Sequence, residues 1–294
     1  PIFILGWGPV PALGTQGAAV ATFIARGAAV AAGIWILLTG GYGVRLRLAD
    51  LRPDWELQRR LVDIGTPATI DGWARSFSSV VMAAFVAQFS VAAIAAYGIG
   101  LRLMSVSWTV SGAIGQATAT GVGQNLGANT PDRAAEVVWK ATAATMAVLF
   151  AAAGLVVAFP AAAIGIFIDE PAVIDEGIVF LRIIAPFWAF FGGVMVIQGG
   201  FRGAGVTKVA MLLSFLSRWI FRVPVALLLA FGWAYTIPGT GLTIAALDWG
   251  VTGLWWAYAV GAFASFIVAV LWFRLGTWKG GVVDREESTP APTD

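Results

Sequence analysis

The chain has 294 residues, of which 59% are hydrophobic and only 12% are charged, and its formal net charge is +2. Because a soluble domain is about half apolar and about a quarter charged, this composition indicates a membrane protein. The absence of Cys and His excludes disulfides, zinc sites built from those residues, and catalytic triads that need either of them. A net charge this small gives no reason to expect a nucleic-acid partner.

Seven stretches of the chain are long enough to cross a bilayer, for which a helix needs about 20 apolar residues. They predict an all-α, polytopic helical bundle and cover residues 16–40, 60–87, 91–124, 134–160, 172–200, 206–233 and 250–276. Residues 1–8 have the character of the end of an eighth span. The first residue is Pro1 rather than Met, so we expect the chain to be a fragment of a longer protein.

Basic residues gather in alternate loops, and this asymmetry predicts the orientation in the membrane. The residues concerned are Arg45, Arg47, Arg52, Arg59, Arg60, Arg133, Lys140, Arg202, Lys208, Arg274, Lys279 and Arg285. We therefore expect a multi-pass protein of the plasma membrane whose 41–59 loop and C-terminus are cytoplasmic. The polar, Pro-rich composition toward the end predicts a disordered tail over residues 278–294.

An internal repeat is suggested by the starts of two predicted spans. Gly14-Thr-Gln-Gly17-Ala-Ala-Val-Ala21 and Gly250-Val-Thr-Gly253-Leu-Trp-Trp-Ala257 share one pattern and start 236 residues apart. Parallel repeats of six spans occur in transporters, although chance is the alternative because Gly and Ala are abundant. The pattern divides the chain into the end of one unit at 1–40, a linker at 41–59 and a complete six-helix unit at 60–277.

Several motifs resemble those of the multidrug and toxic compound extrusion (MATE) transporters, and together they span Pro1 to Lys279. Val122-Gly-Gln-Asn-Leu-Gly-Ala128, followed by Pro131-Asp-Arg-Ala134, is similar to the loop after the family's eighth helix. Gly199-Gly-Phe-Arg-Gly-Ala-Gly205 with Thr207-Lys208 is similar to the loop after the tenth helix. Supporting similarities are Ile64-Gly-Thr-Pro67, Ala95-Ala-Tyr-Gly-Ile-Gly-Leu-Arg102 and Arg222-Val-Pro224.

The resemblance implies two six-helix lobes that rock around a central cavity. Residues 60–277 would be the whole C-lobe and residues 1–40 the last one to two helices of the N-lobe. The protein would be a secondary active antiporter, not an enzyme, that exports cationic or amphipathic organic compounds such as drugs in exchange for H⁺ or Na⁺. No other cofactor is implied. The expected partners are the lipid bilayer, small organic substrates and the remaining N-lobe of the same polypeptide.

The resemblance also implies where coupling acids would lie. Sodium-coupled members of the family carry acids in the seventh and tenth helices. Here no acid stands between Gly177 and Gly200, and Asp71 lies about one turn from the position expected in the seventh helix. The sequence therefore departs from the sodium-coupled pattern in this lobe.

Charged residues inside a bilayer are costly and often functional. Asp71, Arg75 and Arg218 all fall near the middle of their predicted spans. We expect Asp71 to contact Arg75 or Arg218 within about 4 Å, the distance of an ion pair. Such a pair is either structural or part of a cavity wall that responds to an ion or a substrate.

Polar residues also form stripes at helical spacing. Such stripes face water or protein rather than lipid, so they either line a cavity or bond neighbouring helices. With Gln198 added near the inner end of its span, the candidates for the substrate and ion pathway are Asp71, Arg75, Ser78, Ser105, Thr109, Gln116, Gln198 and Arg218. Small residues at Gly115, Ala119, Gly123 and Gly127 predict a seam for close helix packing.

Other functions remain open on the sequence. A flippase for a lipid-linked or polysaccharide precursor, on a related fold, would have a more basic cavity, to which Arg75 and Arg218 would contribute. A non-transporting fragment with a scaffold role is also compatible with the chain. An intramembrane enzyme is disfavoured, because there is no His or Cys to supply a base or a metal site.

Overall fold

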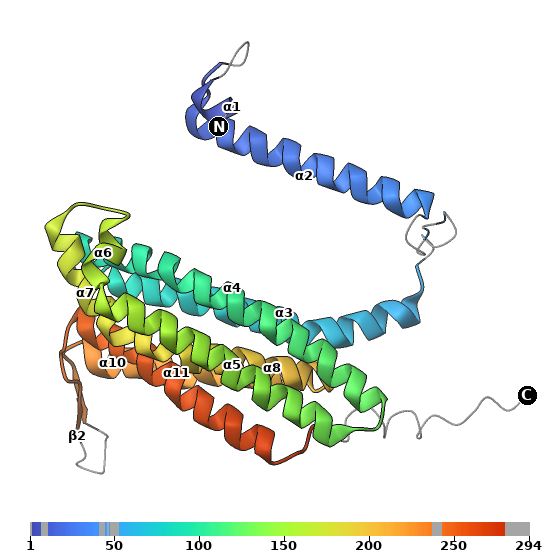
Figure 1. Cartoon of the computed structure of the whole chain (residues 1–294). Coiled ribbons are helices and arrows are strands. Elements are labelled where there is room, and N and C mark those ends of the chain that lie inside the picture. The colour runs from blue at the N-terminus through green and yellow to red at the C-terminus, as the bar shows by residue number, and fades with distance from the viewer. Residues whose placement is uncertain are drawn as a thin grey trace, which may run out of the picture. The chain divides into compact units, whose positions relative to one another are not determined.

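The computed structural model describes residues 2–6, 11–40, 45, 47, 53–236 and 243–279 (Figure 1). The chain divides into two compact units, Pro1–Val62 and Asp63–Asp294. Most of the predicted 41–59 linker and all but the first two residues of the predicted 278–294 tail lie outside the described residues.

The first unit contains α1 (Ile2–Leu5) and α2 (Gly14–Thr39). The Leu13 N–H donates to the carbonyl oxygen of Phe3 at 3.1 Å, and Gly17 packs on that same carbonyl. Large apolar side chains cover the surface of α2, and Phe23 is 80% exposed. An apolar surface of this kind suits lipid rather than water.

The second unit is a helical bundle. It contains α3 (Trp55–Val86) from Asp63 onward. The other described helices of this unit are α4 (Val91–Gly127), α5 (Pro131–Ala158), α6 (Pro160–Gly165), α7 (Pro171–Ile184), η2 (Ala185–Phe187), α8 (Trp188–Gly203), α9 (Thr207–Phe215), η3 (Leu216–Arg222), α10 (Val223–Ala230) and α11 (Val251–Arg274). Two short strands, β1 (Ala234–Thr236) and β2 (Thr243–Ala245), pair antiparallel between α10 and α11. The all-α membrane fold predicted from the sequence is confirmed, with this one hairpin added.

Six of the described helical segments are long and apolar enough to cross a membrane. They are α2, α4, α5, the run from α7 to α8, the run from α9 to α10, and α11. The predicted span at 60–87 corresponds to α3, which has 32 residues but is not among the six. Asp71, Arg75 and several serines make α3 less apolar than the other helices.

The helices and the packing extend past two of the predicted boundaries. α3 begins at Trp55, so the last five residues of the predicted 41–59 linker are helical; the Asp54 carboxylate caps them by accepting the N–H groups of Glu56 and Leu57 at 3.0 and 3.1 Å. At the other end, the packed bundle does not stop at 277. Trp278 is 1% exposed and stacks on Phe273 with ring centroids 4.6 Å apart, because its aromatic ring finds an apolar site at the end of α11.

α8 packs along α4, α5 and α11, and its contact with α4 is made by small residues. A Cβ atom at Gly199 would overlap the carbonyl oxygen of Gly115, and one at Gly203 would overlap that of Ala119. The predicted seam is therefore confirmed at Gly115 and Ala119. It ends before Gly127, where a Cβ atom would meet nothing within 4 Å.

The helix after α9 widens into a π-helix, η3, just before Pro224. Proline has no N–H and its ring crowds the carbonyl group four residues earlier, so a regular α-helix is disturbed at this point. The wider turn accommodates the disturbance, and the Val223 N–H donates to Arg218, five residues back. π-turns are rare and are frequent at functional sites.

We expect Gly199→Ala to destabilise the bundle by about 1–3 kcal/mol, the usual cost of overpacking a tight contact. The added methyl group would have to displace the backbone of α4 at Gly115, which cannot rotate away. Thermal unfolding in detergent, followed by size-exclusion chromatography, measures the effect. Gly154→Ala on α5 is the control, because its Cβ atom would meet nothing within 4 Å; equal stability of the two variants would contradict a close α4–α8 contact.

Candidate functional site

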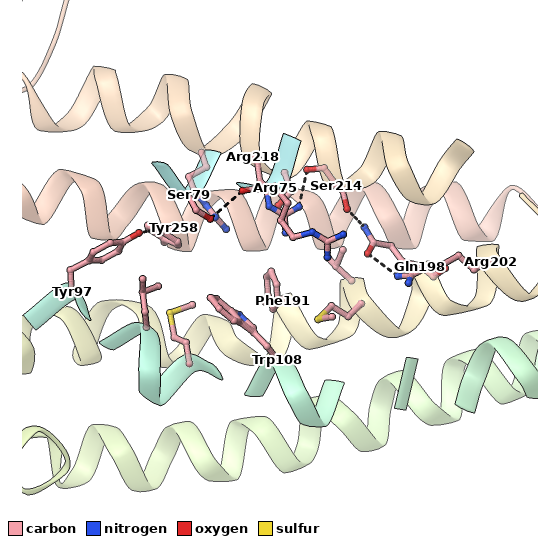
Figure 2. A pocket seen from close by; sticks show the side chains of 16 residues that line it. Arg75, Ser79, Tyr97, Trp108, Phe191, Gln198, Arg202, Ser214, Arg218 and Tyr258 are labelled. Atoms are coloured by element: carbon pink, nitrogen blue, oxygen red, sulfur yellow. Dashed lines mark hydrogen bonds between the residues drawn. The ribbon is translucent and has the colours of Figure 1, made fainter. Parts of the chain in front are cut away.

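The second unit encloses a cavity of about 320 Å³ (Figure 2). Residues from α3, α4, α8, α9, η3 and α11 line it. These helices are far apart in the sequence, so the cavity is a product of the bundle rather than of any single motif.

Four arginines line this cavity, namely Arg75 on α3, Arg202 on α8, and Arg218 and Arg222 on η3. Among the described residues that line it there is no carboxylate. The nearest compensation comes from Asp71, which accepts a bond from Arg75 at 2.6 Å. The cavity is therefore strongly electropositive.

Arg202 and Arg218 are held by a network of hydrogen bonds that crosses between helices. The Arg202 Nε atom donates to the backbone carbonyl of Gln198 at 3.3 Å. The Gln198 side-chain amide donates to the Ser214 hydroxyl at 3.1 Å, and Arg218 donates to the Ser214 carbonyl at 3.2 Å. Gln198 thus connects α8, which carries Arg202, to α9, whose Ser214 holds Arg218.

Arg222 is held by an aromatic ring rather than by an acid. Its guanidinium carbon lies 4.0 Å from the centre of the Tyr258 ring, a cation–π contact, and the residue is only 8% exposed. The hydroxyl groups of Tyr258 and Tyr97 lie 2.7 Å apart and are hydrogen-bonded to each other. The Arg222 Nε atom is buried and has no hydrogen-bond partner among the described residues.

The opposite side of the cavity is apolar and aromatic. Figure 2 shows Trp108 and Phe191 facing the side from which Arg75 and Arg218 enter. The two rings are in tilted contact, with centroids 6.1 Å apart. Met104, Met195 and neighbouring aliphatic side chains complete this wall.

Of the eight candidates predicted from the sequence, Arg75, Gln198 and Arg218 line the cavity. The predicted contact of Asp71 with a basic residue is confirmed, and the partner is Arg75 rather than Arg218. The Asp71 side chain is 18% exposed and that of Arg75 is 50% exposed. Ser78 is buried beside the cavity and does not line it, whereas its neighbour Ser79 does.

The remaining candidates lie elsewhere on α4. Ser105, Thr109 and Gln116 are exposed on the described surface and are not part of the cavity wall. The hydroxyl groups of Ser105 and Thr109 donate to backbone carbonyls of their own helix, at 2.6 and 2.9 Å. Their role in a substrate pathway stays a prediction.

Sequence reasoning did not select Arg202, Arg222, Trp108, Tyr97 or Tyr258 as site residues. Arg202 was interpreted as a loop charge that marks orientation, and Arg222 as part of a family motif. A usable signal was present, because Gln198 with Arg202 and Arg218 with Arg222 are each spaced four residues apart and share a helix face. The aromatic residues carried no such signal.

Membrane-length apolar helices packed around a charged and aromatic cavity define a multi-pass membrane protein of the transporter class. The model of the MatE family matches residues 67–228, and the chain belongs to this MATE family.

Similar proteins agree with the family. The chain is 26% identical to the probable multidrug resistance protein NorM of Thermotoga maritima, over 94% of this chain and 56% of that protein. It is 31% identical to the multidrug resistance protein NorM of Burkholderia vietnamiensis, over 91% of this chain and 56% of that protein. A crystal structure of a mutant of the Vibrio cholerae MATE transporter VcmN has the same fold, with a TM-score of 0.77 and 22% identity over 95% of this chain and 60% of that one. The chain therefore spans little more than half the length of these relatives.

We expect Asp71→Asn to lower the free energy of unfolding by about 1 kcal/mol, between the values for an exposed ion pair and for a buried hydrogen bond to a charge. Arg75 loses its only carboxylate within salt-bridge distance in the described residues, while the shape of the side chain is retained. Thermal unfolding of the purified protein measures the effect. We also expect the ion dependence of any efflux to be unchanged, because a structural pair does not titrate with transport.

Glu136→Gln is the matched control, since Glu136 pairs with Lys140 at 2.6 Å at the same spacing but both side chains are more than half exposed. It should have no measurable effect on unfolding. An Asp71→Asn protein that is as stable as the parent but has lost the pH or Na⁺ dependence of efflux would show instead that the pair belongs to the mechanism.

Proposed function

We propose that this chain forms the C-lobe, with the end of the N-lobe, of an antiporter that exports small organic compounds from the cell in exchange for H⁺ or Na⁺. The observation that carries the proposal is the cavity inside a bundle of membrane-length helices. Small-molecule sites combine apolar and aromatic walls with polar groups that fix orientation. This cavity has such a wall at Trp108 and Phe191, and its polar share, with four arginines, is large.

Two lobes are part of the proposal. The matched region covers only 56% of the Thermotoga maritima relative, which leaves room for a second bundle, and we take the described bundle as one six-helix unit. Transporters with parallel repeats alternate access by moving one bundle against another around a site between or within them. We place the protein in the cell membrane, with residues 41–59 and the C-terminus in the cytoplasm, as the distribution of basic residues predicts.

Of the two substrate types predicted from the sequence, cationic and amphipathic, the cavity supports the amphipathic type. Four guanidinium groups repel a cation in this lobe, whereas Trp108 and Phe191 offer an apolar surface. The relatives are named as multidrug resistance proteins, which does not favour the flippase alternative.

The test is transport by the full-length product of the gene, purified and reconstituted in liposomes. A fluorescent amphipathic dye should move against its gradient when a pH or Na⁺ gradient of the opposite direction is imposed, and movement should stop when an ionophore collapses that gradient. Dye movement that is independent of both gradients, or no movement for a panel of dyes, would overturn the proposed antiport.

A polypeptide of residues 1–294 alone should not confer resistance. One lobe cannot alternate access by itself, so the cavity would have no second bundle to rock against. Growth of an efflux-deficient strain on graded dye or drug concentrations measures this, with the full-length gene product at matched expression as the control. Resistance from residues 1–294 alone would contradict the two-lobe mechanism.

A further inference from the structure

The charges of the cavity are unbalanced. Arg75, Arg202, Arg218 and Arg222 all line it, and Asp71 is the one carboxylate within salt-bridge distance of any of them in the described part of the chain. Guanidinium groups in a membrane-embedded site are costly unless they are hydrated or paired with a negative charge. Arg202, Arg218 and Arg222 have no acidic partner within salt-bridge distance among the described residues.

The cavity also has hydrogen-bond donors that lack acceptors. Two residues that line it each carry a buried N–H group with no partner among the described residues, at the Arg222 Nε and the Trp108 Nε1 atoms. Both are N–H groups, which donate and cannot accept. An occupant that satisfies them must bring acceptor atoms, and an anionic group supplies several.

The shape of the cavity adds a second requirement. Arg75 and Arg218 stand opposite the aromatic pair of Trp108 and Phe191 (Figure 2). A volume of about 320 Å³ has room for a one- or two-ring molecule with a charged substituent. A ring can lie on the apolar wall while its substituent faces the guanidinium groups.

We propose that this cavity binds an aromatic organic anion, a planar ring that carries a carboxylate, sulfonate or phosphate group. Arg218 and Arg222 hold the anionic group, and Trp108 and Phe191 hold the ring. The proposal rests on the proposed transport function only in identifying the occupant as a substrate; binding itself needs no transport.

Binding is tested on the full-length product of the gene in nanodiscs of phosphatidylcholine, which has no net charge. Naphthalene-1-sulfonate is compared with 1-naphthylmethylammonium, which has the same ring and the opposite charge, and with inorganic sulfate, which has no ring. Titration calorimetry gives the dissociation constants. We expect the sulfonate to bind at least about tenfold more tightly than either of the other two, and its binding to weaken as salt is added.

Substitutions locate the site. Arg222→Gln and Arg218→Gln should each weaken binding of the sulfonate by about tenfold or more, the loss of one charge-assisted contact. Arg202→Gln is the variant least able to disturb folding, because Arg202 is exposed and bonds only to Gln198 among the contacts described; it should weaken binding by a smaller factor. Arg182→Gln on α7 removes one exposed charge outside the cavity and should leave binding unchanged.

Phe191→Leu tests the contribution of the aromatic ring separately from that of the charge. It should weaken the binding of naphthalene-1-sulfonate and leave the binding of inorganic sulfate unchanged. Tighter binding of the ammonium compound than of the sulfonate, or sulfonate binding unaffected by all three cavity arginine variants, would overturn the proposal. Equal binding of sulfate and sulfonate would overturn its aromatic part and leave a small-anion or lipid-phosphate site.

The two proposals fail separately. If the protein binds the sulfonate but shows no gradient-driven transport, the antiporter proposal is overturned and the proposed anion site stands. If the protein exports dyes by means of an ion gradient but binds no aromatic anion, the anion-site proposal is overturned and the antiporter proposal stands.

Discussion

Close backbone contact between α4 and α8 determines the width of the cavity. In lipid there is little hydrophobic force to bring helices together, so small residues that allow backbones to touch become the main source of association. Gly199 and Gly203 on α8 meet the carbonyl groups of Gly115 and Ala119 on α4. The same two helices also carry cavity residues: Trp108 lies on α4, and Phe191 and Gln198 lie on α8. A larger residue in the seam would move Trp108 on α4 away from Phe191 and Gln198 on α8.

The second constraint is the proline after η3. Pro224 prevents a regular α-helix through the preceding turn, and the chain responds with a π-helix whose residues include both Arg218 and Arg222. Arg218 reaches back to the Ser214 carbonyl, while Arg222 lies on the Tyr258 ring of α11. The π-helix thus places Arg218 and Arg222 in the same cavity wall, where each guanidinium group contacts a different residue.

Local geometry explains which features could be predicted from the sequence. The spans, the α4 seam and the Asp71–Arg75 pair depend on spacing along a single helix, and the structure confirms the seam in part and the pair. Features that depend on which helices become neighbours were missed. Tyr97 and Tyr258 are 161 residues apart, so their hydrogen bond has no sequence signature. In the sequence Arg202 looks like an ordinary charge at the end of a span, and only the approach of α9 to α8 makes it part of a cavity wall.

The Asp71–Arg75 pair also constrains where coupling can occur. Exchange for H⁺ requires that a bound proton and a bound substrate oppose each other, because each must leave when the other enters. Protonation of Asp71 would release Arg75 from its carboxylate partner and make the cavity more positive, so a proton there would favour an anion rather than expel it. For an anionic substrate, antiport through Asp71 therefore has the wrong sign. If the substrate is an anion, we therefore expect the group that expels it on protonation to be one other than Asp71, whose contact at 2.6 Å orients Arg75.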